Sequence, residues 1–159
     1  MKDYVYLIIP FLSALSAQII KFIGESIKYK KLNWERLFNG NGGMPSTHTS
    51  FTFSLTFTIG FLQGFTSPLF AISLVFACVV GYDAMGLRME SGKQAIAINK
   101  IVDEIFFRNT KIGIKHLKEQ LGHKPLEVVM GIIWALFFTL FLVKYIFNFL
   151  NIEIIIKML

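Results

Sequence analysis

Apolar residues along the chain gather into long runs that polar stretches separate. Residues 4–20 contain no charged side chain, residues 37–82 contain none over 46 positions, and residues 128–143 are again free of charge. A membrane-spanning helix needs about 20 consecutive apolar residues, so the longest run is too long for one span. Glycine and proline within residues 63–68 are typical of a turn and divide that run into two.

These runs predict an all-α, polytopic integral membrane protein that forms a single membrane domain over residues 1–159. The first run lacks a basic leading segment and a small-residue cleavage site, which argues against a signal peptide. Four apolar helices of this kind in a soluble protein would leave almost no polar surface, so a soluble core is a poor alternative. We therefore expect about four transmembrane helices, at residues 4–23, 46–62, 67–84 and 126–150.

The polar stretch between the third and fourth spans, residues 88–122, has a pattern of its own. Within residues 91–109, the apolar positions 95, 98, 101, 102 and 105 follow the spacing of one helix face. Residues 114–121 predict a second, short helix that ends at Gly122. We expect both helices to lie at the membrane surface, with lysines directed toward anionic lipid headgroups.

Composition excludes several classes of protein. The chain is 54% hydrophobic and only 16% charged, with a mean hydropathy of +0.58, which excludes a disordered chain. The single cysteine, Cys78, excludes a disulfide framework and a cysteine-rich metal site. The formal net charge is +6, but basic loops beside apolar spans are normal in membrane proteins. Because nothing in the sequence resembles a nucleic-acid module, we expect no nucleic-acid partner.

The basic residues are unevenly divided between the two sides of the expected membrane. With four spans, the loops at residues 24–46 and 81–127 lie on one side and together carry twelve Lys and Arg residues. The opposite side has only Lys2 and Lys157. The positive-inside rule then places the two loops in the cytoplasm and both termini on the outer side of the cytoplasmic membrane.

Two short polar stretches carry the candidate chemistry. Residues 41–48 read N-G-G-M-P-S-T-H, and residues 122–131 read G-H-K-P-L-E-V-V-M-G. Each places a glycine-containing turn, a histidine and a proline where a membrane helix is expected to begin, and proline suits the first helical turn. Free N–H groups at a helix N-terminus favour anions such as phosphate. Both stretches are therefore candidates for an anion site at the cytoplasmic face.

Histidine and carboxylate spacing adds reactive groups to this site. His123 and Glu127 are four residues apart and are expected to face each other on a helix. A carboxylate there would hold the imidazole in one tautomer, and an oriented neutral histidine can act as a nucleophile or a base. His48 supplies a second group that titrates near neutrality, and Arg88 and Lys93 could clamp an anion.

These motifs resemble a known family. P-S-T-H at residues 45–48 resembles the P-S-G-H motif of the phosphatidic acid phosphatase type 2 superfamily, and H-K-P-L-E-V at residues 123–128 resembles its H-x-P-x-D-V segment. More closely, G-G-M-P-S-T-H, then Y-D-A-M-G-L-R with G-K-Q-A, then L-K-E-Q-L-G-H-K-P-L-E-V resemble the divergent branch of that superfamily. The resemblance runs from about Gln18 to Gly131.

The resemblance implies a metal-independent phosphatase that needs no cofactor. His123 would be the nucleophile that forms a phosphohistidine, Glu127 would orient it in place of the superfamily's aspartate, and His48 would protonate the leaving alkoxide. Cations and helix termini would neutralise the phosphate. The groups implied for phosphate binding are Arg88, Ser46 and the backbone N–H of Thr47.

The chain departs from the superfamily pattern in its basic residues. The superfamily's first motif is a lysine, six residues and then Arg-Pro, and no Arg-Pro is present here. Lys21 and Arg36 are the candidates for these cations, with Lys28 behind them. Arg88 precedes His123 by 35 positions, whereas the corresponding superfamily arginine lies only a few residues before its histidine.

The histidines also have structural interpretations. His48 could cap a membrane helix, and His123 with Glu127 could form a hydrogen bond at a helix entry. His116 has no motif around it and is interpreted as structural. A metal site built from the three histidines and nearby acids would match no known ligand spacing, so no metal is expected.

The cations have structural interpretations of their own. Lys21 could snorkel from the end of a span, and Arg36 and Lys93 lie in loops where basic residues are expected in any case. Arg88 could be a positive anchor at a span end. Asp83 could pair with Arg88 or simply end the third span, and the sequence leaves both open.

We predict a membrane lipid phosphatase that acts on a phosphomonoester or diphosphate at the cytoplasmic face. A site at headgroup level suits a phospholipid or polyprenyl phosphate substrate, such as phosphatidylglycerol phosphate or phosphatidic acid. One alternative is a non-catalytic membrane protein that binds anionic lipid or phosphate at a degenerate site. A channel or transporter has less support, because no charge is expected mid-helix apart from Lys144. The sequence leaves the oligomeric state open.

Overall fold

The residues that the structure describes fold mainly into helices. The computed structural model describes residues 4–30, 32, 43–106, 116–119 and 122–149. Within these residues every regular element is a helix, so the all-α prediction is confirmed there. The helices are α1 (Val5–Tyr29), α3 (Thr47–Gln63), α4 (Pro68–Met85), α5 (Leu87–Phe106) and α6 (Pro125–Phe149).

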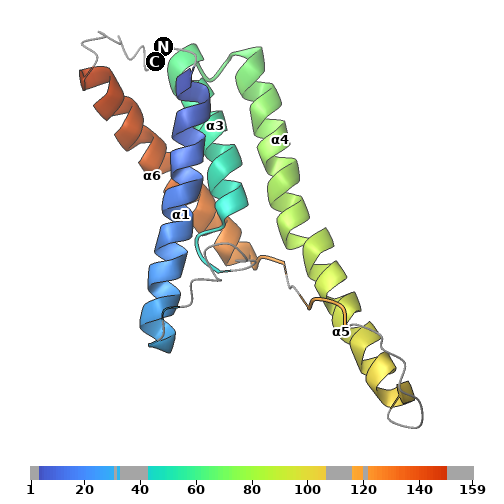
Figure 1. Cartoon of the computed structure of the whole chain (residues 1–159). Helices are drawn as coiled ribbons and strands as arrows, with labels where there is room; N and C mark the ends of the chain where they lie inside the picture. The colour runs from blue at the N-terminus through green and yellow to red at the C-terminus, as the bar shows by residue number, and fades with distance from the viewer. Residues whose placement is uncertain (1–3, 31, 33–42, 107–115, 120–121, 150–159) are drawn as a thin grey trace.

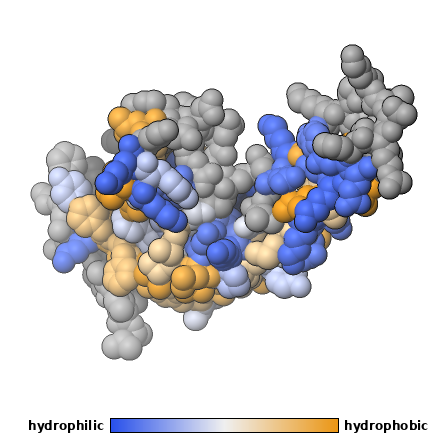
Figure 2. All heavy atoms as spheres, turned by 90° about the horizontal axis from the view of Figure 1, so that it is seen from below, coloured by the Kyte–Doolittle hydropathy of each residue, from blue (hydrophilic) through white to orange (hydrophobic). Residues whose placement is uncertain are grey.

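The helices form a bundle in which α3 is the central member. α3 packs against α1, α4 and α6, and α1 also packs against α6. Figure 1 shows α1 and α4 running in one direction and α3 and α6 in the other. The starts of α3 and α6 and the junction of α4 with α5 therefore share one end of the bundle. We call this the polar end, because hydrophilic residues gather there and along α5 when it is viewed end-on (Figure 2).

Local sequence signals explain where the helices begin. The Ser46 side chain caps α3 by accepting a hydrogen bond from the backbone N–H of Thr49, as serine commonly does at a helix N-terminus. Ser67 caps α4 in the same way, and Pro68 fills the first helical position, where its missing N–H costs nothing. Between these helices Gly64 adopts φ +94°, a conformation that favours glycine.

Within the described part of the chain, three helical stretches are long and apolar enough to cross a membrane: Val5–Tyr29, Pro68–Glu104 and Pro125–Tyr145. The fourth predicted span, residues 46–62, is present as α3, but α3 has only 17 residues. Seven of those residues are serine or threonine. The prediction of four spans is thus supported by length and composition at three helices.

The serine and threonine side chains of α3 face its neighbours. Ser54 shares a buried hydrogen bond of 2.7 Å with Thr139 of α6, and Ser50 donates to the carbonyl oxygen of Gly131, also on α6. Ser13 of α1 donates to the carbonyl oxygen of Ser50. Buried hydroxyls of this kind link helices inside membranes. The large apolar side chains instead lie on the outside of the bundle, for example Ile72, Val75, Val79, Phe137 and Phe141.

The polar stretch after α4 differs from its predicted form. A helix is present at Leu87–Phe106, close to the predicted residues 91–109, but it continues nearly in line with α4 and does not turn across the end of the bundle (Figure 1). The predicted short helix at residues 114–121 is wrong over its described part, because residues 116–119 are not helical. Asn99 pairs with both the N–H and the carbonyl of Leu117, each at 2.9 Å. An N–H and a carbonyl that both pair with one side chain are not available for the hydrogen bonds of a helix.

Candidate functional site

Two histidines that are distant in sequence meet at the polar end. His48 lies in the first turn of α3, and His123 lies two residues before α6 begins. Their ring centroids are 6.4 Å apart, with the ring planes at 65°. His123 is 4% exposed, whereas His48 is exposed. The pair therefore has one member enclosed by the protein and one open to its surroundings.

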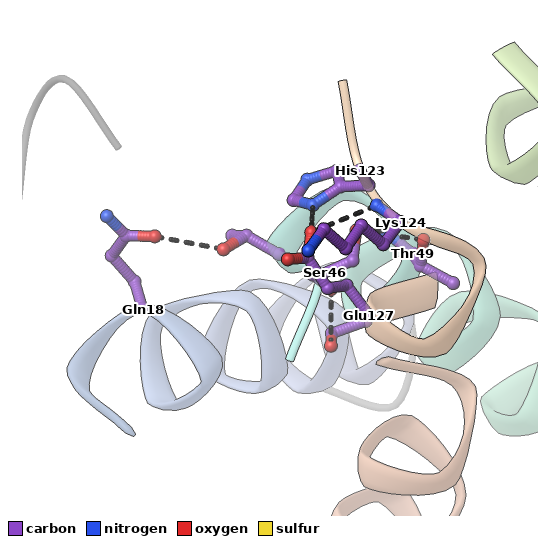
Figure 3. Close-up of polar contacts among 8 residues, drawn as sticks. Gln18, Ser46, Thr49, His123, Lys124 and Glu127 are labelled. Carbon is purple, nitrogen blue, oxygen red and sulfur yellow. Dashed lines mark hydrogen bonds and ion pairs between the residues drawn. The ribbon is translucent and has the colours of Figure 1, made fainter. Parts of the chain in front are cut away.

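A carboxylate at the start of α6 holds the buried histidine. Nδ1 of His123 lies 2.8 Å from Oε2 of Glu127, and the backbone N–H of Lys124 donates to the same oxygen at 3.2 Å (Figure 3). Lys124 precedes the helix and Glu127 is its third residue, so the second contact is one half of a capping box.

The contact with Glu127 selects the tautomer of His123. A carboxylate accepts hydrogen bonds and cannot donate them when ionised, so the proton of a neutral imidazole resides on Nδ1. The lone pair is then on Nε2, on the opposite edge of the ring. An imidazole oriented in this way is suited to attack an electrophile through Nε2.

The surroundings of His123 keep it neutral. Burial lowers the pKa of His123 below its ordinary value of 6.5, and the positive charges of Lys21 and Arg88 lower it further. The hydrogen bond and charge of Glu127 act in the opposite direction, but the net shift is downward. His123 is therefore mainly unprotonated at neutral pH, as a nucleophile must be.

This shift predicts how a reaction at His123 responds to acid. Because protonation removes the Nε2 lone pair, activity should fall as the pH drops through the pKa of His123. The acidic limb of kcat/KM, which reports groups of the free enzyme, should lie below pH 6.5. An inflection above 6.5 would contradict the neutral, buried state of His123.

A glycine allows the backbone before α6 to approach the junction of α4 with α5. The N–H of His123 donates to the carbonyl oxygen of Ala84 at 2.9 Å. A Cβ atom on Gly122 would lie 2.6 Å from the backbone nitrogen of Met89 and 2.7 Å from the oxygen of Ala84. No side chain fits there, so glycine at this position lets His123 enter the site.

Backbone contacts also fix the start of α3 against the start of α6. The N–H of Ser46 donates to the carbonyl oxygen of Glu127 at 3.0 Å. The Ser46 side chain is fully buried and accepts hydrogen bonds from Thr49. A Cβ on Gly131 would lie 2.9 Å from the Ser46 oxygen, so a glycine again permits the approach. The two helix starts therefore form one rigid unit that carries both histidines.

Gln18 of α1, which the sequence did not indicate as a site residue, contacts the start of α3. Gln18 accepts a hydrogen bond from the hydroxyl of Thr47 at 2.9 Å (Figure 3). Lys21 lies three residues further along α1 and is 3% exposed, and its side chain lies against Gly43. The only sequence signal for Gln18 is this spacing, which places it on the same helix face as Lys21.

The other predicted cations divide into those near the histidines and those elsewhere. Arg88 is close enough to influence the pKa of His123. Its Nε atom pairs with Asp83 at 3.3 Å, which settles the question about Asp83 that the sequence left open. Lys93 pairs with Glu90 at 2.7 Å on α5. Arg36 lies outside the described residues.

The third histidine is apart from the cluster. His116 lies 2.8 Å from Asp103 of α5, and both side chains are more than half exposed. Among the residues that the structure describes, no group of three or more His, Cys, Asp or Glu stands close enough to hold a metal ion. The chemistry available at the polar end is thus that of two imidazoles, a carboxylate and nearby cations.

The spacing of the two imidazoles suits a phosphoryl group between them. A nucleophile reacts with phosphorus from about 3–3.5 Å, and an acid donates a proton to the leaving oxygen over about 2.6–3.2 Å, so both groups must lie close to the same phosphoryl group. The ring centroids of His48 and His123 are 6.4 Å apart. The two rings are therefore close enough to contact one small anion.

Replacing Glu127 with glutamine removes the negative charge of the side chain but keeps its capping hydrogen bond. Glutamine also serves at the third position of a capping box, and its single carbonyl oxygen can accept from both Lys124 N–H and His123 Nδ1–H. We expect Glu127→Gln to keep the stability of the protein and to lower kcat about fivefold, because a hydrogen bond to a charged acceptor is worth about 1 kcal/mol more than a neutral one.

Glu127→Ala is the matched comparison. It removes the cap as well as the charge and should lower the melting temperature in addition to kcat, since loss of an N-terminal cap costs about 1 kcal/mol. Thermal unfolding and steady-state kinetics on both variants make the measurement. Equal kcat for Glu127→Gln and the wild type would show that the carboxylate acts only as a cap.

Comparisons with known proteins agree with the motifs at this site. The family described as the Divergent PAP2 family matches residues 3–138. An uncharacterized membrane protein of Bacillus subtilis (strain 168), YuiD, is 39% identical over 147 residues, which cover 84% of this chain and 92% of that protein. No solved structure matches the chain.

Proposed function

Since the chain belongs to the Divergent PAP2 family of membrane proteins, we propose that it is a metal-independent lipid phosphatase that works through a phosphohistidine. The observation that carries this proposal is the meeting of His48 and His123 at 6.4 Å, with His123 held by Glu127. A histidine that only capped a helix would not require a second imidazole across from it.

In the proposed reaction, Nε2 of His123 attacks the phosphorus of a phosphate ester. The N–P bond forms while the bond from phosphorus to the leaving oxygen breaks, and His48 gives its proton to that oxygen. Water then attacks the phosphorus, the N–P bond breaks, and His48 takes a proton from the water. Inorganic phosphate leaves, and both histidines return to their starting states.

Cations near the histidines would stabilise the charge on the transferring group. Lys21 and Arg88 both influence the pKa of His123 through their charge, so both lie within electrostatic reach of it. Fixed positive charge in a site shielded from water stabilises a phosphoryl transition state strongly. We assign phosphate binding to these two side chains, together with Ser46 and the backbone N–H of Thr47. For Ser46, this role requires its hydroxyl to act while it caps α3.

A lipid substrate fits the place of the site in the fold. The polar end lies where apolar helices stop, at the level that phospholipid headgroups occupy if the bundle crosses a bilayer. α3 would then cross as the fourth span, enclosed by the other three. The excess of Lys and Arg in the loops at this end favours a cytoplasmic orientation. A phospholipid or polyprenyl phosphate is thus the substrate class that we propose.

One observation favours a second candidate, a non-catalytic protein that binds anionic lipid or phosphate. Arg88 is paired with Asp83 and is half exposed, so part of its charge is already neutralised. A guanidinium has five N–H donors, however, and this pair uses Nε. Arg88 can therefore still contact phosphate, and the phosphatase remains the better supported function.

The test is phosphate release by the purified full-length protein. Phosphatidic acid, phosphatidylglycerol phosphate and a polyprenyl diphosphate would be supplied in mixed micelles with excess chelator, and inorganic phosphate would be measured over time. We expect release from at least one of them. If none yields phosphate while inorganic phosphate still protects the protein against thermal unfolding, the protein is the non-catalytic binder.

A further inference from the structure

The segment that returns from α5 to the site is attached to that helix by one buried side chain. Asn99 lies on α5, is 5% exposed and makes three hydrogen bonds. Its Nδ2 donates to the carbonyl oxygen of Leu117 at 2.9 Å and to Oε1 of Glu119 at 2.8 Å. Its Oδ1 accepts from the N–H of Leu117 at 2.9 Å. Both polar groups of the amide are thus used on this segment.

A neighbouring ion pair contributes less to the attachment. His116 and Asp103 lie 2.8 Å apart, but their side chains are 55% and 61% exposed. Exposed pairs stabilise a structure little because water competes for both partners. A buried amide with all of its contacts made is costly to disrupt, so Asn99 is the main anchor of the segment.

The second anchor of the returning segment is at the active site. His123 N–H donates to the oxygen of Ala84, and Gly122 lies against the backbone at Met89. Leu117 is thus held beside Asn99 of α5, and His123 is held beside Ala84 of α4, nearer the junction of the two helices.

A short connection joins the two anchors of the segment. Ala84 and Asn99 are 15 residues apart on helices that run nearly in line (Figure 1). Only six residue steps connect Leu117 with His123. A change at the Asn99 anchor therefore acts on the chain within six residues of His123.

We propose that Asn99 is a positioning residue for His123. By fixing Leu117 on α5, it sets the point from which the chain continues to His123 and hence where the imidazole of His123 stands opposite His48. This role rests on the proposed phosphatase function, but the position of His123 can also be measured without turnover. Asn99 does not touch the substrate in this account.

The primary test compares Asn99→Ala with Glu104→Ala, an exposed position on the same helix. Asn99→Ala should lower kcat about 10- to 100-fold, as a misplacement near 1 Å does, with KM little changed. The nuclear magnetic resonance titration of His123 should move upward toward 6.5, because the ring loses part of its burial. Glu104→Ala should leave kcat and titration unchanged. A wild-type kcat and titration in Asn99→Ala would overturn the proposal.

A rescue experiment keeps the test decisive if Asn99→Ala does not fold. Asn99→Asp retains the acceptor for Leu117 N–H but places a carboxylate against Glu119. Adding Glu119→Gln supplies a donor to that carboxylate and should restore kcat and the His123 titration toward wild type. No restoration by the second substitution would count against Asn99 as the anchor.

The two readouts separate this inference from the proposed function. If the wild type releases no phosphate from any substrate but Asn99→Ala still moves the His123 titration, the phosphatase function fails and the positioning role stands. If the wild type is active and Asn99→Ala changes neither kcat nor the titration, the positioning role fails alone.

Discussion

His123→Asn should abolish phosphate release from lipid phosphates, lowering kcat by more than about 10⁴-fold, as removal of a nucleophile does in enzymes with covalent intermediates. Asparagine can still hydrogen-bond to Glu127 from a similar position, so the start of α6 is retained. What is lost is the imidazole Nε2 and with it the N–P bond. Kinetics at saturating substrate, with thermal unfolding to verify the fold, make the measurement.

His116→Asn provides the control for this experiment. His116 is an exposed histidine paired with Asp103, and it lies outside the cluster at the polar end. Its replacement should leave kcat within about twofold of the wild type, because the His116 side chain is more than half exposed and contacts neither His48 nor His123 in the described residues. If His123→Asn retained activity within tenfold of the wild type, a phosphohistidine at this position would be untenable.

His48→Gln should give a loss that depends on the leaving group. A general acid contributes about 10²–10⁴-fold where the leaving oxygen must be protonated, so release from a lipid phosphate should fall by that factor. An aryl phosphate with an electron-poor ring leaves as a stable phenolate and needs no acid. Its first turnover should therefore stay near the wild-type rate.

The role of His48 is measured by comparing the effect of His48→Gln on the aryl phosphate with its effect on the lipid phosphate. Burst experiments on the aryl phosphate report the step that forms the phosphoenzyme, and steady-state kinetics on the lipid phosphate report the whole cycle. An equal loss on both substrates would mean that His48 binds the phosphate or supports α3 and does not protonate the leaving oxygen.

Much of the helical architecture follows from the spacing of apolar residues. Each of the four apolar runs is found as a helix, and the amphipathic pattern at residues 91–109 corresponds to α5. The error in the predicted helix at residues 114–121, over its described residues 116–119, has a physical cause. Asn99, some 18 positions away, pairs with the backbone of Leu117, and the local spacing of apolar residues carries no information about such a partner.

The site was predictable to the extent that it depends on local motifs. The contact between His123 and Glu127 was expected from their spacing, although its geometry is different: His123 precedes the helix, and Glu127 reaches back as a capping residue does. The partners contributed by other helices, such as Gln18 and Ala84, were not predictable. Their roles depend on how α1 and α4 pack, which one sequence does not state.

The hydroxyl-rich surface of α3 bears on how the chain is inserted into a bilayer during synthesis. A segment in which seven of 17 residues are serine or threonine partitions into lipid less readily than its more apolar neighbours. Hydroxyls of α3 form hydrogen bonds with Gln18 of α1 and Thr139 of α6, and α6 follows α3 in the chain. If α3 crosses the bilayer, it is best inserted together with α4 as a hairpin, and it gains its partner on α6 only after α6 has been made. The same step brings His123 to His48, so the two histidines cannot meet until α6 is in place.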